Sequence, residues 1–509
     1  MSQCRVGIGT SQNPLEMPTT GNSSAAADKA RDAVGLLFRA TFVACLMGSM
    51  SLLLFSSFNP SADSGAAYWL RLPNGILSQA GWSSAEYDGE GESTNISHIV
   101  FGIGGCVQSW PNRSRYSTLW WQPDLMRGYV WLDEEPPKAS ALAAAENGSI
   151  PYRISEDTSR FKYSSSKSAV RIARIFLETF RLNLPHVRWF VMGDDDTVFF
   201  PDNLVTVLSR YDHREMWYIG GNSESVEQDA IHSYGMAFGG GGFAISYPLA
   251  ASLVKIFDGC LDRYYRFYGS DQRLWACAAE IGVPLTVESG FHQIDIRGNP
   301  YGLLAAHPLT PLVSLHHIDS VDPIFPKTRY DSLRSLTSAY RADPSRTLQQ
   351  AFCYDRARKW SIAVSWGYTV RIYPSLVAAH LMETPLRTFK TWRTFSKGPF
   401  TFNTLAVETQ PCEAYAVYFL DRVQEAGRSG SLTSYVRSMD GPAKGCGDAP
   451  HDRVAVVERI VVSSVKMDPK YWQKAPRRQC CEMGDGGSIR NGTLRLRIRK
   501  CRSSETMTV

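Results

Sequence analysis

The segment Trp189-Phe-Val-Met-Gly-Asp-Asp-Asp196 carries the clearest structural signal in the chain. It is a short apolar run that ends abruptly in three carboxylates. Such a run predicts a strand that is buried on both faces, as strands of parallel sheets are. Ligands bind at the carboxyl ends of strands in open α/β sheets, so the acidic triplet lies where a site is expected.

The segments around this strand alternate between strand and helix patterns. Strands are predicted at 98–104, 128–132, 189–193, 216–219, 243–246 and 284–287, and helices at 168–182, 203–208, 247–257 and 271–281. Ser270 is the expected N-cap of the last helix, Gly282 follows its end, and 136–166 reads as a polar loop. The alternation predicts an α/β domain with a mostly parallel sheet over residues 97–326.

The pattern changes after Pro326. Helices are predicted at 332–342 and 347–351, and β-rich segments at 360–373, 414–420, 454–465 and 493–498. Residues 327–509 are therefore predicted to form a second, β-rich region packed on the first.

An uncharged segment at 40–58 has the roughly 17–25 residues that a transmembrane helix needs. Lys29, Arg31 and Arg39 precede it, and the next basic residue is Arg71, which predicts a cytosolic N-terminus. A cleaved signal peptide and a buried soluble helix are the alternatives. The predicted parts are a cytosolic tail (1–39), a transmembrane anchor (40–58) and a stem (59–96).

Composition excludes several classes of protein. The chain has 509 residues, of which 20% are charged and 12% aromatic, which is not the composition of a disordered protein. The net charge of +5 is small and its lysines and arginines are scattered, so no nucleic-acid partner is expected.

Sequons and cysteines agree with a translocated chain. The sequons begin at Asn95, Asn112, Asn147 and Asn491, all after the predicted anchor. Nine cysteines also follow the anchor, enough for a few disulfides in an oxidising compartment. Cys260 and Cys277 flank the Asp271 segment and are predicted to form a disulfide, with two buried thiols as the alternative.

The acidic triplet has the chemistry of a cation site. Residues i and i+2 of an extended chain project to the same side, so Asp194 and Asp196 can share one ligand. Carboxylate oxygens attract hard divalent cations such as Mg²⁺ or Mn²⁺. A solvated acidic turn is the alternative. As an exposed loop acid, Asp196 is expected to carry little stability.

Three further features accompany the triplet. The glycine run Gly239-Gly-Gly-Gly242 suits close approach of backbone to a ligand, or else a flexible or bulged turn. Asp271, in the first turn of a predicted helix, is either a general base or a residue that stabilises the helix start. His316 and His317 are either core residues or metal ligands.

The order of these motifs resembles the fringe-like branch of glycosyltransferase family 31, most closely its plant members with a C-terminal domain of unassigned function. Trp189-Phe-Val-Met-Gly-Asp-Asp-Asp-Thr-Val-Phe199 resembles the fringe metal motif, and Phe238-Gly-Gly-Gly-Gly-Phe-Ala-Ile-Ser246 resembles its Gly-Gly-Ala-Gly turn. Stretches 301–319, 364–374 and 400–403 resemble the plant branch, and the whole resemblance covers residues 97–500.

The resemblance implies a glycosyltransferase-A fold with helices on both faces of the sheet, a UDP-sugar donor, and Mn²⁺ or another divalent cation. It places Asp194, Asp195, Gly240 and Gly241 beside the nucleotide, Asp196 with His316 or His317 on the metal, and Asp271 as the inverting base. Many relatives have an acidic pair at this helix start, whereas here Ser270 and Gln272 flank a lone Asp271. Glu288 and Asp295 are the next candidates for the base.

Two functions from different classes follow. The first is an inverting, metal-dependent glycosyltransferase that moves a sugar from a UDP-sugar to a glycan or glycoprotein, through a β-1,3 linkage. It is expected to be a single-pass type II protein of the Golgi membrane with a luminal catalytic part. The second is a catalytically silent, lectin-like or scaffolding relative with the same fold. A soluble phosphate-handling enzyme suits the triplet but not the anchor and sequons.

Overall fold

The computed structural model describes residues 93–163, 167–407, 415–426, 430–438, 454–503 and 505–506. The predicted tail, anchor and most of the predicted stem lie outside these residues. Within the described part of the chain, no helix has the length and apolar character needed to cross a membrane.

A seven-stranded sheet forms the centre of the first region, in the order β3-β2-β1-β4-β7-β6-β8. Four of its six pairings are parallel, and β7 is antiparallel to both its neighbours. The α/β class and the mostly parallel sheet are therefore confirmed. The strands are β1 (Ile99–Gly104), β2 (Arg127–Leu132), β3 (Tyr152–Ile154), β4 (Trp189–Asp194), β6 (Tyr218–Gly220), β7 (Phe243–Ser246) and β8 (Leu285–Val287).

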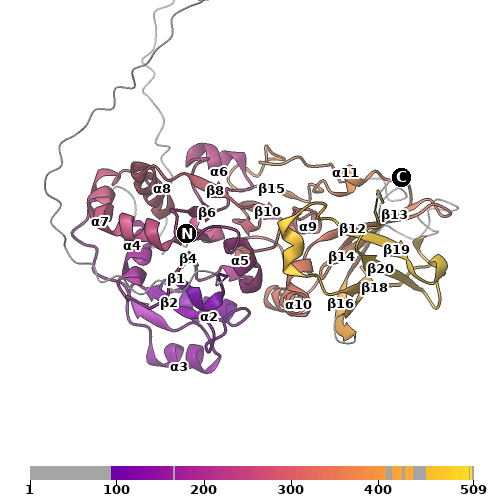
Figure 1. Ribbon diagram of the computed structural model, residues 1–509, viewed down its shortest axis with the longest axis horizontal. Helices are drawn as coiled ribbons and strands as arrows, with labels where there is room; N and C mark the ends of the chain where they lie inside the picture. Colours follow the sequence, from indigo (N-terminus) through magenta and orange to yellow (C-terminus); the bar gives the residue numbers. More distant parts are fainter. Residues whose placement is uncertain are drawn as a thin grey trace, which may run out of the picture. The chain divides into compact units, whose positions relative to one another are not determined.

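Apolar side chains project from both faces of this sheet and pack into two hydrophobic cores. Ile99 and Phe101 of β1 belong to one hydrophobic core, and Val100 between them belongs to another. The second core contains buried residues of α4, α7 and α8, which cluster beside the sheet in Figure 1. The helices of this region are α2 (Trp110–Ser117), α3 (Lys138–Glu146), α4 (Lys167–Phe180), α5 (Pro201–Leu208), α6 (Val226–Ile231), α7 (Tyr247–Arg263), α8 (Ser270–Ile281) and α9 (Tyr301–Ala305).

Three local predictions are wrong. The predicted loop 136–166 contains α3 and β3, because α3 is rich in alanine, the best helix former, and β3 pairs with the edge of β2. Gly269, not Ser270, is the N-cap of α8, although Gly282 does end that helix with a left-handed φ of 89°. The predicted helix 347–351 is overridden by the start of strand β12, which pairs with β13.

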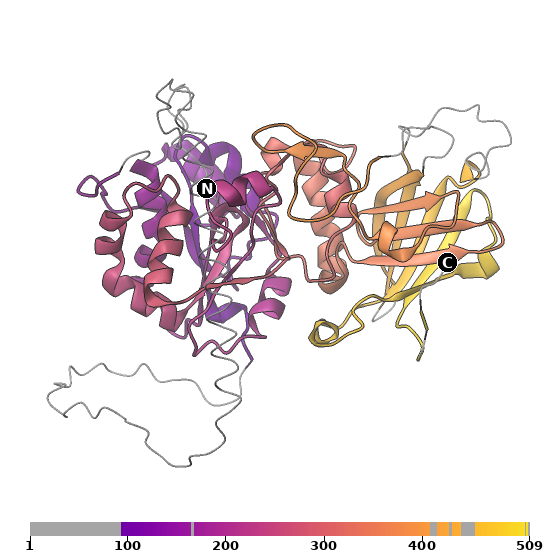
Figure 2. The ribbon, with the colours of Figure 1, turned by 90° about the horizontal axis from the view of Figure 1, so that it is seen from above.

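The C-terminal region is β-rich, as predicted. Its eight-stranded sheet has the order β12-β13-β14-β16-β17-β18-β20-β19, and its strands run side by side in orange to yellow in Figure 2. Disulfides join Cys353 to Cys481 and Cys480 to Cys501. The strands are β12 (Gln350–Asp355), β13 (Trp360–Ser365), β14 (Thr369–Tyr373), β16 (Ala416–Ala426), β17 (Gly430–Arg437), β18 (Arg459–Val465), β19 (Cys480–Met483) and β20 (Thr493–Arg499).

Two small sheets complete the framework of the site. β5 (Val198–Phe199), β11 (Ser314–Leu315) and β9 (Phe291–His292) form one, and β10 (Ile296–Gly298) pairs with β15 (Phe389–Thr391) in the other. The second of these sheets joins the two predicted regions, so segments beyond Pro326 reach the α/β part. The remaining helices are α10 (Arg329–Ala342), α11 (Ala379–Met382) and the 3₁₀ turns η1 (Ile96–His98), η2 (Gly239–Gly241), η3 (Ile318–Ser320), η4 (Pro344–Arg346), η5 (Pro469–Gln473) and η6 (Gly484–Gly487).

Candidate metal and sugar-transfer site

The acidic triplet is buried at the end of β4. Asp194 is the last residue of the strand, and Asp195 and Asp196 form the turn that leads to β5. Their exposed fractions are 1%, 6% and 3%. The solvated acidic turn is therefore excluded, and the expectation that Asp196 is an exposed loop acid is wrong. Buried carboxylates need partners, so these three must be explained by what surrounds them.

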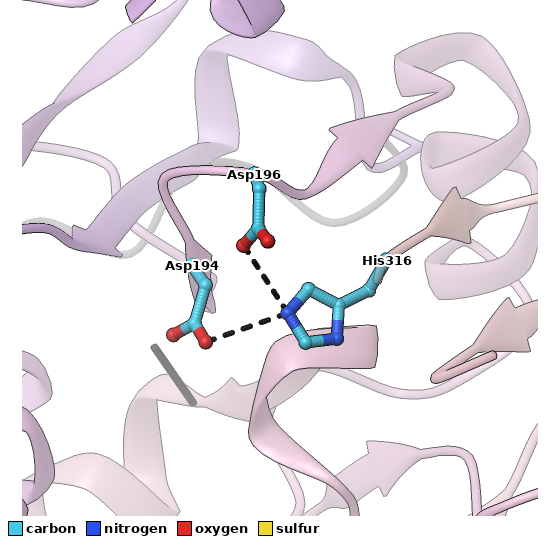
Figure 3. Close-up of side chains that lie close together, drawn as sticks. All are labelled: Asp194, Asp196 and His316. Carbon is cyan, nitrogen blue, oxygen red and sulfur yellow. Dashed lines mark ion pairs between the residues drawn. The ribbon is translucent and has the colours of Figure 1, made fainter. Parts of the chain in front are cut away.

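His316 is the first of these partners. It directly follows β11, and β11 is antiparallel to β5, so the strand pairing carries the histidine back to the triplet. Its Nε2 lies 3.2 Å from Asp196 Oδ1 and 3.6 Å from Asp194 Oδ2. Figure 3 shows one ring nitrogen of His316 facing both carboxylates.

These three side chains suit a divalent cation. One potential ligand atom from each lies within 4.8 Å of the others. Asp196 Oδ1 and both ring nitrogens of His316 are buried and, apart from the ion pairs of His316 with Asp194 and Asp196, have no hydrogen-bond partner among the described residues. Buried polar atoms normally have partners. Two carboxylate oxygens and one imidazole nitrogen form a donor set that Mn²⁺ accepts.

The charges of the cluster are strongly coupled. Burial alone would lower the pKa of His316, but the Asp196 and Asp194 carboxylates raise it to about 9. Burial would raise the pKa of Asp196, but His316 and Arg113 hold it well below its usual value. Burial and the neighbouring Asp196 raise the pKa of Asp195 to about 7. In the protein alone, the protonated histidine thus supplies positive charge where a cation would otherwise do so.

Arg113 is the main residue of the site that sequence reasoning missed. It lies on α2, a helix that was not predicted, and its guanidinium is 2.8 Å from Asp195 and 3.0 Å from Asp196. Ser109 Oγ also donates to Asp195 Oδ2 at 3.0 Å. Asp195 is therefore held by α2 and its N-cap residue, and its contact with a nucleotide stays a prediction.

The glycine run packs against the metal-site histidine. A Cβ on Gly240 would overlap the His316 ring, so this close approach requires glycine. Thr197 Oγ1 donates to the Gly240 carbonyl at 2.7 Å, and Gly241 N–H donates to Gln293 Oε1 at 2.6 Å. The structure thus explains Gly240 by its histidine neighbour, and nucleotide binding by Gly240 and Gly241 stays a prediction.

Asp271 connects α8 to the glycine run. The residue is 9% exposed; its Oδ2 accepts from Gly239 N–H at 3.3 Å and its Oδ1 from Gln272 N–H at 3.1 Å. The predicted Cys260–Cys277 disulfide is confirmed and ties α8 to α7. The structure therefore brings Asp271 to the turn that packs on His316, and its role as a base stays a prediction.

The two alternative bases already have strong partners. Glu288 accepts hydrogen bonds from Tyr211 and, at 2.9 Å, from Arg210. Asp295 accepts from Ser223 Oγ at 2.8 Å and lies 3.0 Å from His317 Nδ1.

His317 lies beside the cluster rather than in it. Its ring stacks on Trp392, with 4.3 Å between centroids and 7° between planes, and Arg297 covers the same indole at 3.6 Å. Burial and the charge of His316 lower its pKa to about 4. Asp194, not His317, completes the three-residue cluster with Asp196 and His316. Trp392 comes from beyond Pro326, and no sequence signal pointed to it.

Comparisons with known proteins match two overlapping ranges. Residues 133–294 match the family described as Fringe-like. Residues 228–481 match a family described as a protein of unknown function, DUF604. The first range contains the acidic triplet and Asp271, whereas His316 lies only in the second. No curated protein matches the chain.

Several solved structures show weak similarity. One is a glycosyltransferase involved in the glycosylation of the major capsid of PBCV-1, at 13% identity over 37% of this chain and 81% of that chain, with a TM-score of 0.23. Another is mouse xyloside xylosyltransferase 1 in its apo form, at 10% identity over 38% of this chain and 84% of that chain, with a TM-score of 0.26. The glycosyltransferase GlyE of Streptococcus pneumoniae aligns at 10% identity over 38% of this chain and 45% of that chain, with a TM-score of 0.25. At these TM-scores, the similarities carry no argument about this chain.

Proposed function

We propose that this protein is an inverting, metal-dependent glycosyltransferase that moves a sugar from a UDP-sugar to a glycan or glycoprotein acceptor. The observation that carries the proposal is the buried cluster of Asp194, Asp196 and His316 at the carboxyl end of a central strand. The Fringe-like match over residues 133–294 supports a fringe-like glycosyltransferase. The β-1,3 linkage rests on the sequence resemblance.

The cluster would hold Mn²⁺ through Asp194, Asp196 and His316. When bound there, the cation supplies positive charge to the departing diphosphate. Arg113 holds Asp195 and Asp196 in place through its ion pairs. Asp271, fixed by Gly239 and by the start of α8, takes the proton from the acceptor hydroxyl as that oxygen attacks the anomeric carbon.

We further propose that the protein is a single-pass type II protein of the Golgi membrane, anchored by residues 40–58. The uncharged segment and the later sequons support this topology. Protease treatment of intact microsomes should leave residues 97–509 protected, and glycosidase should increase the mobility of the full-length protein. Protease access to that region, with unchanged mobility after glycosidase, would contradict the topology.

The activity is tested with a panel of UDP-sugars and the purified full chain. We expect Mn²⁺-dependent hydrolysis of at least one donor, lost in Asp196→Asn, which keeps the size of the buried side chain. Asp322→Asn, on an exposed aspartate, is the matched control and should retain hydrolysis. Mn²⁺-dependent UDP binding without hydrolysis or transfer of any donor would favour the silent, lectin-like alternative.

A further inference from the structure

A cavity of about 910 Å³ lies between segments of the α/β part and segments beyond Pro326. Neither the triplet, His316 nor Asp271 lines it. Its lining includes Ser223, Glu224, Tyr234, His307, Phe402 and Arg478. Most of these residues lie inside the DUF604 match, for which no function is described. The volume is in the range of small-molecule sites.

Hydrogen bonds fix the wall that the C-terminal region contributes. Thr401 N–H donates to the Glu224 carbonyl, and Thr401 Oγ1 donates to the Ser223 carbonyl, both at 3.1 Å. Phe400 also forms an antiparallel bridge with Ser225. The wall is therefore hydrogen-bonded to the backbone of the α/β part and does not contact it through side-chain packing alone.

This wall and the rim offer apolar surface. The rings of Phe400 and Phe402 are half-buried and stacked, with centroids 5.8 Å apart and 19° between planes, and both pack on Phe389. At the rim, Tyr234 is 56% exposed and Val287 is 53% exposed. Aromatic faces of this kind can pack against the C–H face of a pyranose ring.

The charge of the lining argues against an anionic ligand. Glu224, Asp229 and Glu383 are acidic, whereas Arg478 is the one lysine or arginine in the described lining. Arg478 is already paired with Glu383 at 2.6 Å. The Glu383–Arg478 pair carries no net charge, and burial raises the pKa of Asp229 to about 7, so Glu224 is the clearest negative charge of the described lining. No lysine or arginine of the described lining is left unpaired to bind a phosphate or a uronic acid, whereas a neutral polyhydroxyl ligand needs no such cation.

The lining also carries hydrogen-bonding groups. His307 Nδ1 lies 2.8 Å from the Pro308 carbonyl, so Nδ1 carries the proton and Nε2 remains an acceptor. Among the described residues, neither His307 Nε2 nor His292 Nε2 has a hydrogen-bond partner. Asn403 adds an exposed amide. A sugar hydroxyl both donates and accepts, so it can satisfy such a mixed set.

A chain of contacts connects the cavity to the cluster. Ser223, in the lining, donates to Asp295 at 2.8 Å, and Asp295 lies 3.0 Å from His317 Nδ1. The rings of His317 and His316 are 3.9 Å apart between centroids.

We infer that this cavity binds a neutral saccharide of the acceptor and that the C-terminal region exists partly to form its wall. That the saccharide belongs to the acceptor rests on the proposed function, but saccharide binding can be measured separately from catalysis.

The test is binding of the full chain to an immobilised panel of neutral and acidic oligosaccharides. We expect the wild type to bind neutral members selectively. Tyr234→Ala and Phe402→Ala should each weaken binding roughly 2- to 10-fold, and the double variant by the product of the two losses, roughly 4- to 100-fold. Tyr163→Ala, on another exposed tyrosine outside the cavity, should bind as the wild type does.

Calorimetry of UDP with Mn²⁺ separates the two proposals. The cavity variants should keep wild-type UDP affinity, and Asp196→Asn should lose it while still binding saccharide. No binding to neutral oligosaccharides, binding to acidic ones alone, or unchanged binding in the double variant would overturn the cavity assignment. Unchanged UDP affinity in Asp196→Asn would overturn the proposed function and leave the saccharide site standing.

Discussion

At the scale of single residues, the site is defined by which acids are buried and what lies against them. Asp194 and Asp196 face one nitrogen of His316, while Arg113 of α2 forms ion pairs with Asp195 and Asp196. Asp271 lies apart from this cluster and is linked to it through the glycine run. Substitutions at Arg113 and Asp271 should therefore have different effects.

Removal of Arg113 should destabilise the protein when metal is absent. Arg113→Met leaves two buried carboxylates with one cation fewer, and we expect a loss of about 2–4 kcal/mol in unfolding free energy. Mn²⁺ should restore part of this loss by binding the folded state. Arg214→Met, which removes an exposed ion pair with Asp212, should cost about 0–1 kcal/mol. Equal losses in urea unfolding would show that Arg113 does not compensate the triplet.

Substitution of Asp271 should affect chemistry and not donor binding. Asp271→Asn keeps the size of the side chain and an oxygen for Gly239 N–H, but removes the proton acceptor. Transfer should fall by about 10²–10⁴-fold, while UDP affinity with Mn²⁺ stays unchanged. Transfer near the wild-type rate would make Asp271 a helix-start residue only, and the base would have to be sought elsewhere.

At the scale of elements, the glycine turn and β11 together fix the position of His316. Gly240→Ala would place a methyl group on the His316 ring, so the histidine must move. We expect about 1–3 kcal/mol of destabilisation and weaker Mn²⁺ binding. Gly259→Ala, within α7 and near only a flexible arginine terminus, is the control and should be neutral or slightly stabilising. Equal stability and metal affinity in both variants would contradict the packing argument.

A second prediction concerns α4. Burial raises the pKa of Glu178 to about 7, so between its ordinary pKa near 4.5 and 7 the folded state binds more protons than the unfolded state. Stability should therefore fall as pH rises through this window. In the wild type, the unfolding free energy should fall by an amount on the order of 2 kcal/mol between pH 5 and pH 8 because of this group. Glu178→Gln keeps an oxygen for the Glu156 N–H but does not titrate, so this fall should be absent in the variant. Urea unfolding at both pH values measures this, and an unchanged pH slope in the variant would contradict it.

The same scale shows why some elements could be predicted and others could not. β4 and α4 carry strong local patterns, and both lie close to their predicted limits. α3 forms because it is rich in alanine, and β3 forms because it pairs with β2. Neither cause was recognised when residues 136–166 were judged by their polar composition. The residue types of the cluster were predicted because acids after an apolar strand are unusual. Arg113 and Trp392 were missed because only tertiary structure brings them to the site.

At the scale of the whole molecule, the described parts on either side of Pro326 share a strand pairing and a hydrophobic core. β10 pairs with β15, and a single hydrophobic core includes residues from Ile99 to Ile498. His316 lies only within the DUF604 match, although the carboxylates it faces lie within the Fringe-like match. The proposed metal site therefore requires residues from both matched ranges.

Calorimetric titration of UDP into the full chain, with and without Mn²⁺, decides whether the acidic cluster is a metal-dependent nucleotide site. We expect the wild type and Asp322→Asn to bind UDP only when Mn²⁺ is present, and Asp196→Asn to bind it under neither condition. UDP affinity that is independent of Mn²⁺, or that is the same in Asp196→Asn as in the wild type, would contradict this expectation.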